Sequence, residues 1–116
     1  MTDTDSPDTT DATDPPRPIA LGSRETLDAL VADGGRALVE FYANGCRKCA
    51  AMEPVLGIVA RRTDATVATI NARETLDLVE ELGFQGVPTF VVYRDGEVTD
   101  QLFGTFDADE LVAAVE

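Results

Sequence analysis

Both cysteines of the chain lie in one short segment, Cys46-Arg47-Lys48-Cys49. The segment comes soon after an apolar run that ends at Tyr42, and it opens a stretch in which apolar residues recur at helical spacing. Two thiols so placed could form a redox couple, contribute to a metal site, or be ordinary thiols of a hydrophobic core. Each of these three chemistries requires different neighbouring residues.

The position of Cys46 favours a redox couple. At the start of a helix, unpaired N–H groups and the positive end of the helix dipole stabilise a thiolate, and the neighbouring cations Arg47 and Lys48 act in the same direction. We therefore expect a lowered pKa for Cys46, which would be the nucleophile that attacks a substrate disulfide. Cys49, one helical turn further on, is expected to be more shielded and to act as the resolving cysteine that closes the intramolecular disulfide.

The other two chemistries find less support. A structural zinc site needs four ligands, whereas the chain has two cysteines and no histidine. A metal shared between two chains and a pair of inert core thiols remain as weaker alternatives. We therefore predict no metal and no bound cofactor, since dithiol exchange needs none.

The composition indicates one small acidic domain. The chain has 116 residues, 44% of them hydrophobic, and a formal net charge of −13. Lys48 is the only lysine. So acidic a chain is not expected to bind nucleic acid or anionic membranes. The acidic, lysine-poor composition looks like that of a haloarchaeal cytosolic protein, and ordinary solubility is the alternative explanation.

Residues 1–17 differ from the rest of the chain. They consist largely of Asp, Thr, Ser and Pro and hold almost no residue that could enter a core. We predict a disordered acidic tail over 1–17 and one domain over 18–116. Because the chain starts without a basic or apolar signal pattern and has no apolar run near the roughly 20 residues of a membrane span, we predict a cytoplasmic protein.

Beyond residue 18 the apolar pattern predicts alternating strands and helices. Ser23 and Asp107 are placed to cap helices, Gly83 to end one, and Asp95-Gly96 to turn a hairpin. In the third helix Leu76, Val79 and Leu82 are expected to share the buried face. The predicted strands cover 19–21, 36–42, 66–70, 89–93 and 98–103, and the helices run from about 23, over 46–62 with a kink at Pro54, over 73–82, and from 107.

This order of elements predicts a single α/β domain with a central mixed β-sheet flanked by helices on both faces. Helical crossovers between the early strands favour parallel pairing, and the final hairpin adds antiparallel strands.

Several short motifs follow one another along the chain. They are Leu38-Val39-Glu40-Phe41-Tyr42-Ala43, the Cys-x-x-Cys pair, Pro54, Gly86-Val87-Pro88-Thr89-Phe90, Asp95-Gly96-Glu97-Val98 and Gly104. In this order and spacing the chain from about Ile19 to Val115 resembles the thioredoxin family. The resemblance implies a thioredoxin fold and a thiol–disulfide oxidoreductase that reduces protein disulfides. It also implies recycling by a separate reductase or small thiol, and we expect a monomer.

The resemblance assigns roles to three further residues. Pro88 matches the family's cis-proline beside the disulfide, and Val87 before it would offer backbone groups to an extended substrate. Glu40 matches the buried carboxylate beneath the resolving cysteine. There it would move a proton to and from Cys49, with a pKa raised by desolvation.

The chain also departs from the family pattern. Gly45 stands where a Trp is usual, and Arg47-Lys48 replaces the usual Gly-Pro. We count all three among the residues that contact substrate, and we expect the two cations to raise the reduction potential. Thr69 replaces a common Lys, which leaves Glu40 with a higher proton affinity. These departures keep a binding or chaperone module with little redox turnover as the alternative function.

Overall fold

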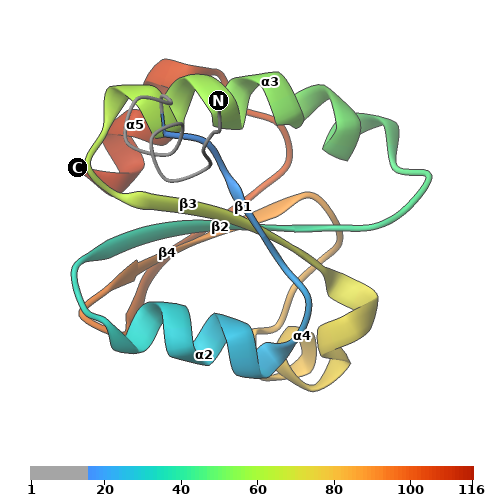
Figure 1. The fold of residues 1–116 in the computed structure, drawn as a ribbon. Helices are drawn as coiled ribbons and strands as arrows, with labels where there is room; N and C mark the ends of the chain where they lie inside the picture. Colours follow the sequence, from blue (N-terminus) through green and yellow to red (C-terminus); the bar gives the residue numbers. More distant parts are fainter. Residues whose placement is uncertain (1–15) are drawn as a thin grey trace, which may run out of the picture.

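The structure is a computed structural model that describes residues 16–116. Most of the predicted acidic tail, residues 1–15, lies outside the described residues. The elements follow in the predicted order, and the predicted α/β class is confirmed (Figure 1). They are β1 (Ile19–Leu21), α2 (Arg24–Ala32), β2 (Arg36–Tyr42), α3 (Arg47–Arg62), β3 (Thr66–Asn71), the 3₁₀ turn η2 (Ala72–Thr75), α4 (Leu76–Leu82), β4 (Thr89–Arg94), β5 (Glu97–Phe103) and α5 (Ala108–Val115).

The strands form one mixed sheet in the order β1-β3-β2-β4-β5. Strand β3 pairs parallel with both β1 and β2, whereas β4 pairs antiparallel with β2 and β5. Both pairing predictions are therefore confirmed. Strand β2 lies at the centre of the sheet, and five of its seven residues are buried, as its continuous apolar run indicated.

Helices cover both faces of the sheet, with α3 and α5 on one and α2 and α4 on the other (Figure 1). Alternate residues of β2 point to opposite faces. Leu38 packs with residues of α3 and α5, while Val39 and Phe41 pack with residues of α2 and α4. The sheet thus separates two hydrophobic cores.

Local polar groups set the ends of the helices, as predicted. Asp107 Oδ1 accepts a hydrogen bond from the Glu110 N–H at 2.8 Å, and Glu110 Oε1 accepts one from the Asp107 N–H at 2.9 Å. Ser23 caps α2 in the same reciprocal way with Thr26. Each capping box satisfies two backbone donors that a helix start leaves free.

The third helix differs from its prediction. Residues 72–75 form a 3₁₀ turn, and the α-helix starts only at Leu76. Asn71 Oδ1 accepts a hydrogen bond from the Arg73 N–H at 2.8 Å, and the Thr75 hydroxyl donates to the Asn71 carbonyl at 3.4 Å. The predicted buried position of Leu76 is wrong, because its side chain is 66% exposed and Leu78 is buried in its place.

Candidate active site

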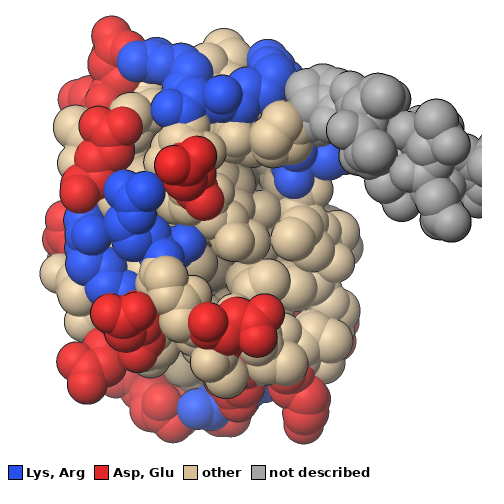
Figure 2. All heavy atoms as spheres, turned by 60° about the vertical axis from the view of Figure 1, so that its left-hand side comes forward, with Lys and Arg blue, Asp and Glu red and all other residues tan. Residues whose placement is uncertain are grey.

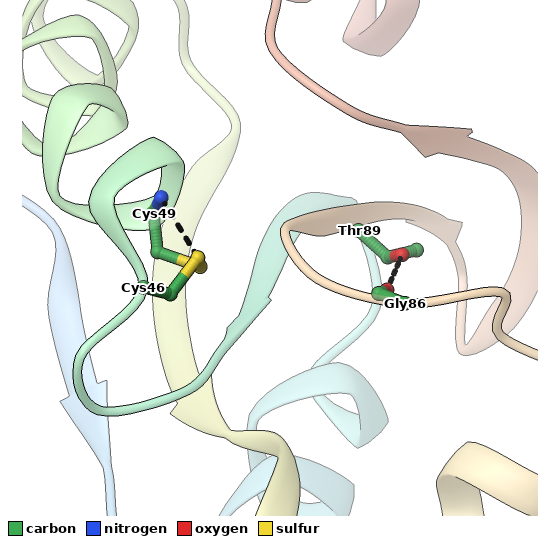
Figure 3. The surroundings of a disulfide bond; sticks show 4 residues. All are labelled: Cys46, Cys49, Gly86 and Thr89. Atoms are coloured by element: carbon green, nitrogen blue, oxygen red, sulfur yellow. Dashed lines mark hydrogen bonds between the residues drawn. A yellow bond between two sulfur atoms is a disulfide. The ribbon is translucent and has the colours of Figure 1, made fainter.

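The two cysteines lie where β2 gives way to α3, and they form a disulfide (Figure 3). Gly45 turns the chain with a φ of 77°, a conformation that suits glycine. Cys46 is then the N-cap of α3, and its Sγ accepts a hydrogen bond from the Cys49 N–H at 3.2 Å. The Cα atoms of the two cysteines are 5.2 Å apart, within the range that a disulfide spans.

The two sulfurs differ in access to solvent. Cys46 is half-buried, whereas Cys49 is 4% exposed. The predicted shielding of Cys49 is therefore confirmed. Arg47 and Lys48 lie exposed on the first turn of α3, and within residues 16–116 neither forms an ion pair. Both charges stay free to act on the region around the sulfurs.

The turn before β4 lies at the same end of the sheet as the cysteines. Because β4 runs antiparallel to β2, with Thr89 opposite Phe41, the start of β4 lies beside the end of β2. Figure 3 shows Gly86 and Thr89 across from the disulfide. The Val87–Pro88 peptide bond is cis, as predicted.

Hydrogen bonds fix this turn on both sides of Pro88. The Thr89 hydroxyl donates to the Gly86 carbonyl at 2.6 Å, and the Gly104 N–H donates to the Pro88 carbonyl at 2.9 Å. Pro88 is buried and Val87 is half-buried. The turn is thus a firmly held surface across from the disulfide.

Glu40 lies in the middle of β2 and is only 2% exposed. It shares the α3 face of the sheet with Leu38, and it pairs in register with Thr69 of β3 and Phe90 of β4. Its Oε2 has no hydrogen-bond partner within the described part of the chain. Burial, with a smaller contribution from the negative charge of Glu53, raises the pKa of Glu40 to about 7.

Sequence reasoning missed Glu53, the second carboxylate near the disulfide. It lies on α3 four residues after Cys49, so the two share one side of the helix. This spacing was visible in the sequence. Its importance became clear only once β2 placed Glu40 close enough for the charge of Glu53 to affect its pKa.

The geometry permits one reaction directly. Two cysteines that close a disulfide can exchange two electrons and two protons with another disulfide and need no bound group to do so. Among residues 16–116 no cluster of three or more metal-ligating side chains is found. Fold and site together define a dithiol oxidoreductase that acts on disulfides.

Comparison with known proteins gives the family. The thioredoxin family profile matches residues 19–116, and the chain belongs to the thioredoxin family. Thioredoxin of Pseudomonas aeruginosa is 33% identical over 91 residues, which cover 77% of this chain and 83% of that protein. Thioredoxin of Mycoplasmoides gallisepticum is 27% identical over 92 residues, covering 78% of this chain and 92% of that protein.

A solved thioredoxin structure has the same fold as this chain. A mutant thioredoxin from Halobacterium salinarum superposes with a TM-score of 0.81 and 36% identity, covering 89% of this chain and 92% of that one. Its halophilic source fits the halophilic character predicted from the acidic composition. Family membership also favours the oxidoreductase over a binding module without turnover, and it implies disulfide-containing protein substrates and a reductase partner.

Proposed function

We propose that Cys46 is the nucleophile and Cys49 the resolving cysteine of this oxidoreductase. The Cys46 thiolate attacks a disulfide of a protein substrate, forms a mixed disulfide and releases one substrate thiolate. Cys49 then attacks Cys46 Sγ and releases the second, leaving the Cys46–Cys49 disulfide for a separate reductase or small thiol to reduce. The observation that carries this order is the difference in access, since Cys46 is half-buried and Cys49 is 4% exposed.

Electrostatics supports Cys46 in this role. Its Sγ lies at the N-terminus of a 16-residue helix, where the dipole favours a negative charge, and Arg47 and Lys48 follow it directly. Replacing both cations with Gln should lower the reduction potential by up to about 30 mV, which is a tenfold change in a two-electron equilibrium. Equilibration with dithiothreitol buffers in molar KCl, read by thiol alkylation and mass, measures it.

The turn at Val87 and Pro88 is proposed to align the substrate chain. The buried cis-proline and the two hydrogen bonds around it hold the Val87 backbone across from the disulfide. An extended segment of substrate can pair with backbone groups there, as in strand addition. Gly45 leaves the opposite rim without a large side chain, so this turn contributes more of the contact.

Glu40 is proposed to hold and return the proton of Cys49. A carboxyl group with a pKa near 7 can take up a proton and release it again at neutral pH. Glu40→Gln should slow the resolving step at least about ten-fold and flatten its pH profile around neutrality. An unchanged pH profile in single-turnover kinetics would contradict this role.

We infer a monomer in a salt-rich cytoplasm. No helix within residues 16–116 is long and apolar enough to cross a membrane. Figure 2 shows basic side chains in two groups on this face, one along its top and one at its left, with acidic side chains beside them. The formal net charge of −13 argues against nucleic acid as a partner.

The order of the two cysteines is tested with single substitutions. Cys46→Ser should abolish the reduction of insulin disulfides, because the remaining thiol, Cys49, is buried. Cys49→Ser should also prevent turnover, but it should accumulate a stable mixed disulfide through Cys46 that mass spectrometry detects. A mixed disulfide that forms equally well in Cys46→Ser would contradict the proposed order of the two cysteines.

A further inference from the structure

A second way to reach the disulfide exists beside the one at the Val87–Pro88 turn. A hollow of about 460 Å³ borders both Cys46 and Cys49. Its other walls come from β1, the end of β2, β3, the loop before Cys46 and the first turns of α3, and no residue of the turn at 86–88 contributes to it. Protein substrates aligned by that turn would therefore leave this hollow free.

Small side chains make the hollow. Ala20 of β1 lies next to Thr69 of β3 in the sheet register, and both line it together with Gly45 and Ala50. Its volume lies within the range of pockets that bind small molecules. It therefore fits a compact ligand better than a folded substrate segment.

The charge of the lining selects among small ligands. Glu53 is the single charged side chain that lines the hollow within residues 16–116, with Asn44 and Tyr42 as polar neighbours. Glu40 is buried close by, on the strand position that pairs with Thr69. Arg47 and Lys48 do not line the hollow, so a ligand carboxylate inside it would meet the negative charge of Glu53. A primary amine can instead form a charge-assisted hydrogen bond with Glu53.

We propose that this hollow is a binding site for small disulfides that carry primary amines, which the Cys46–Cys49 pair reduces without using the Val87–Pro88 turn. The proposal rests on the roles assigned above to the two cysteines. The Cys46 thiolate attacks one sulfur of the small disulfide and releases one aminothiolate, and the other half stays bound to Cys46 with its amine at Glu53. Cys49 attacks Cys46 Sγ and releases the second aminothiolate.

The reaction balances without another reactant. Two electrons pass from the cysteine pair to the small disulfide, the Cys46–Cys49 bond forms as the ligand S–S bond breaks, and the two thiol protons end on the released aminothiols. The same path in reverse lets two aminothiols reduce the Cys46–Cys49 disulfide.

The test compares three small disulfides that differ in charge. The reduced full-length protein is mixed with cystamine, bis(2-hydroxyethyl) disulfide or dithiodiglycolate, and its oxidation is followed by rapid quenching and alkylation. In 1 M KCl the Debye length is about 3 Å, so the net charge of the protein contributes little. Dithiothreitol serves as the reference dithiol. The ratio of the cystamine rate to the dithiodiglycolate rate should be at least about ten-fold larger for the protein than for dithiothreitol.

Two substitutions separate this site from general reactivity. Ala20→Phe should fill the hollow and lower the rate with cystamine about ten-fold relative to the rate with insulin. Ile19→Phe is the matched control, because Ile19 precedes Ala20 on β1, is 44% exposed and does not line the hollow. Glu53→Gln should remove the preference for cystamine over dithiodiglycolate, with both rates divided by the rate for the neutral disulfide so that an effect through Glu40 cancels.

The outcomes keep the two proposals apart. If insulin is reduced but the three small disulfides react in the same ratios as with dithiothreitol, the hollow is no binding site and the proposed function stands. The same conclusion follows if Ala20→Phe behaves like Ile19→Phe. If insulin is not reduced while the cystamine preference is found and is lost in Glu53→Gln, the hollow is the substrate site and the role of the Val87–Pro88 turn is wrong.

Discussion

The two faces of the sheet differ in the side chains that they bury. On the α2 and α4 face, Leu27, Val39, Phe41 and Leu78 pack into a core of apolar side chains. On the α3 and α5 face, a similar apolar core is joined by Glu40, which is the one buried charged side chain among residues 16–116. The open hollow beside the disulfide also lies on this second face.

The α2 and α4 face contributes mainly to stability, whereas the α3 and α5 face holds a group that can take part in chemistry. Burying a large apolar side chain contributes about 1.5–3 kcal/mol, and the α2 and α4 face does so without a buried carboxylate. The opposite face gives up part of that gain, because a buried carboxyl group without a hydrogen-bond partner for Oε2 costs free energy. The benefit is a group that can exchange protons near neutral pH, close to a pair of thiols.

The largest expected effect on stability comes from the apolar face. Leu27 of α2 is 1% exposed and packs against β2 and β3. Leu27→Ala should lower the free energy of unfolding by about 2–5 kcal/mol, since it removes buried methyl groups and leaves a cavity. Urea unfolding of the oxidised protein at constant KCl measures the change.

A matched leucine on the same face serves as the control. Leu76 starts α4 but is 66% exposed, so Leu76→Ala should change stability by less than about 0.5 kcal/mol. Equal losses for the two variants would mean that this face depends on its surface as much as on its core, and the contrast between faces would fail.

Glu40→Gln should change stability in a pH-dependent way. Because the pKa of Glu40 rises from 4.5 to about 7 on folding, the protonated folded state is favoured. Its contribution is complete below pH 4.5 and is lost as the pH rises through 7. The variant lacks this loss, so above pH 7 it should be more stable than the parent by up to about 3 kcal/mol.

The measurement is the difference between two pH profiles of unfolding, both in the oxidised form so that the cysteines do not titrate. Subtraction removes the other carboxylates, which titrate in both proteins. Glu53→Gln should give a smaller change of the same sign, because the charge of Glu53 is the lesser cause of the shift. Parallel profiles for Glu40→Gln and the parent would mean that Glu40 is ionised without cost.

The sequence predicted the features whose causes are local. The helix caps at Ser23 and Asp107, the Asp95-Gly96 turn and the buried run of β2 each depend on neighbours a few residues away. The cysteine pair at a helix start belongs to this group. The cis bond before Pro88 was predicted through the resemblance, and no local pattern established it.

What the sequence did not predict depends on rotation and on distant contacts. The side chains of Asn71 and Thr75 form the 3₁₀ turn that carries Leu78 into the core in place of Leu76. A hydrophobic pattern of period 3.6 cannot report such a turn. The hollow likewise joins Ala20 to Glu53, residues on separate elements whose approach only the packing of β1 and β3 against α3 determines.

The smallest expected effect tests whether the backbone just before Cys46, at the start of α3, is strained. Gly45 has a φ of 77°, so Gly45→Ala should lower the free energy of unfolding by about 1 kcal/mol even though the added Cβ has open space. Gly57 within α3 is the matched control, because its Cβ would meet only Arg61 at 3.6 Å and Gly57→Ala should stabilise the helix by about 1 kcal/mol. Opposite signs for these two changes, twelve residues apart, would show that glycine before Cys46 is required by the backbone. If Gly45→Ala were stabilising too, the absence of a larger side chain there would have to be explained by substrate contacts alone.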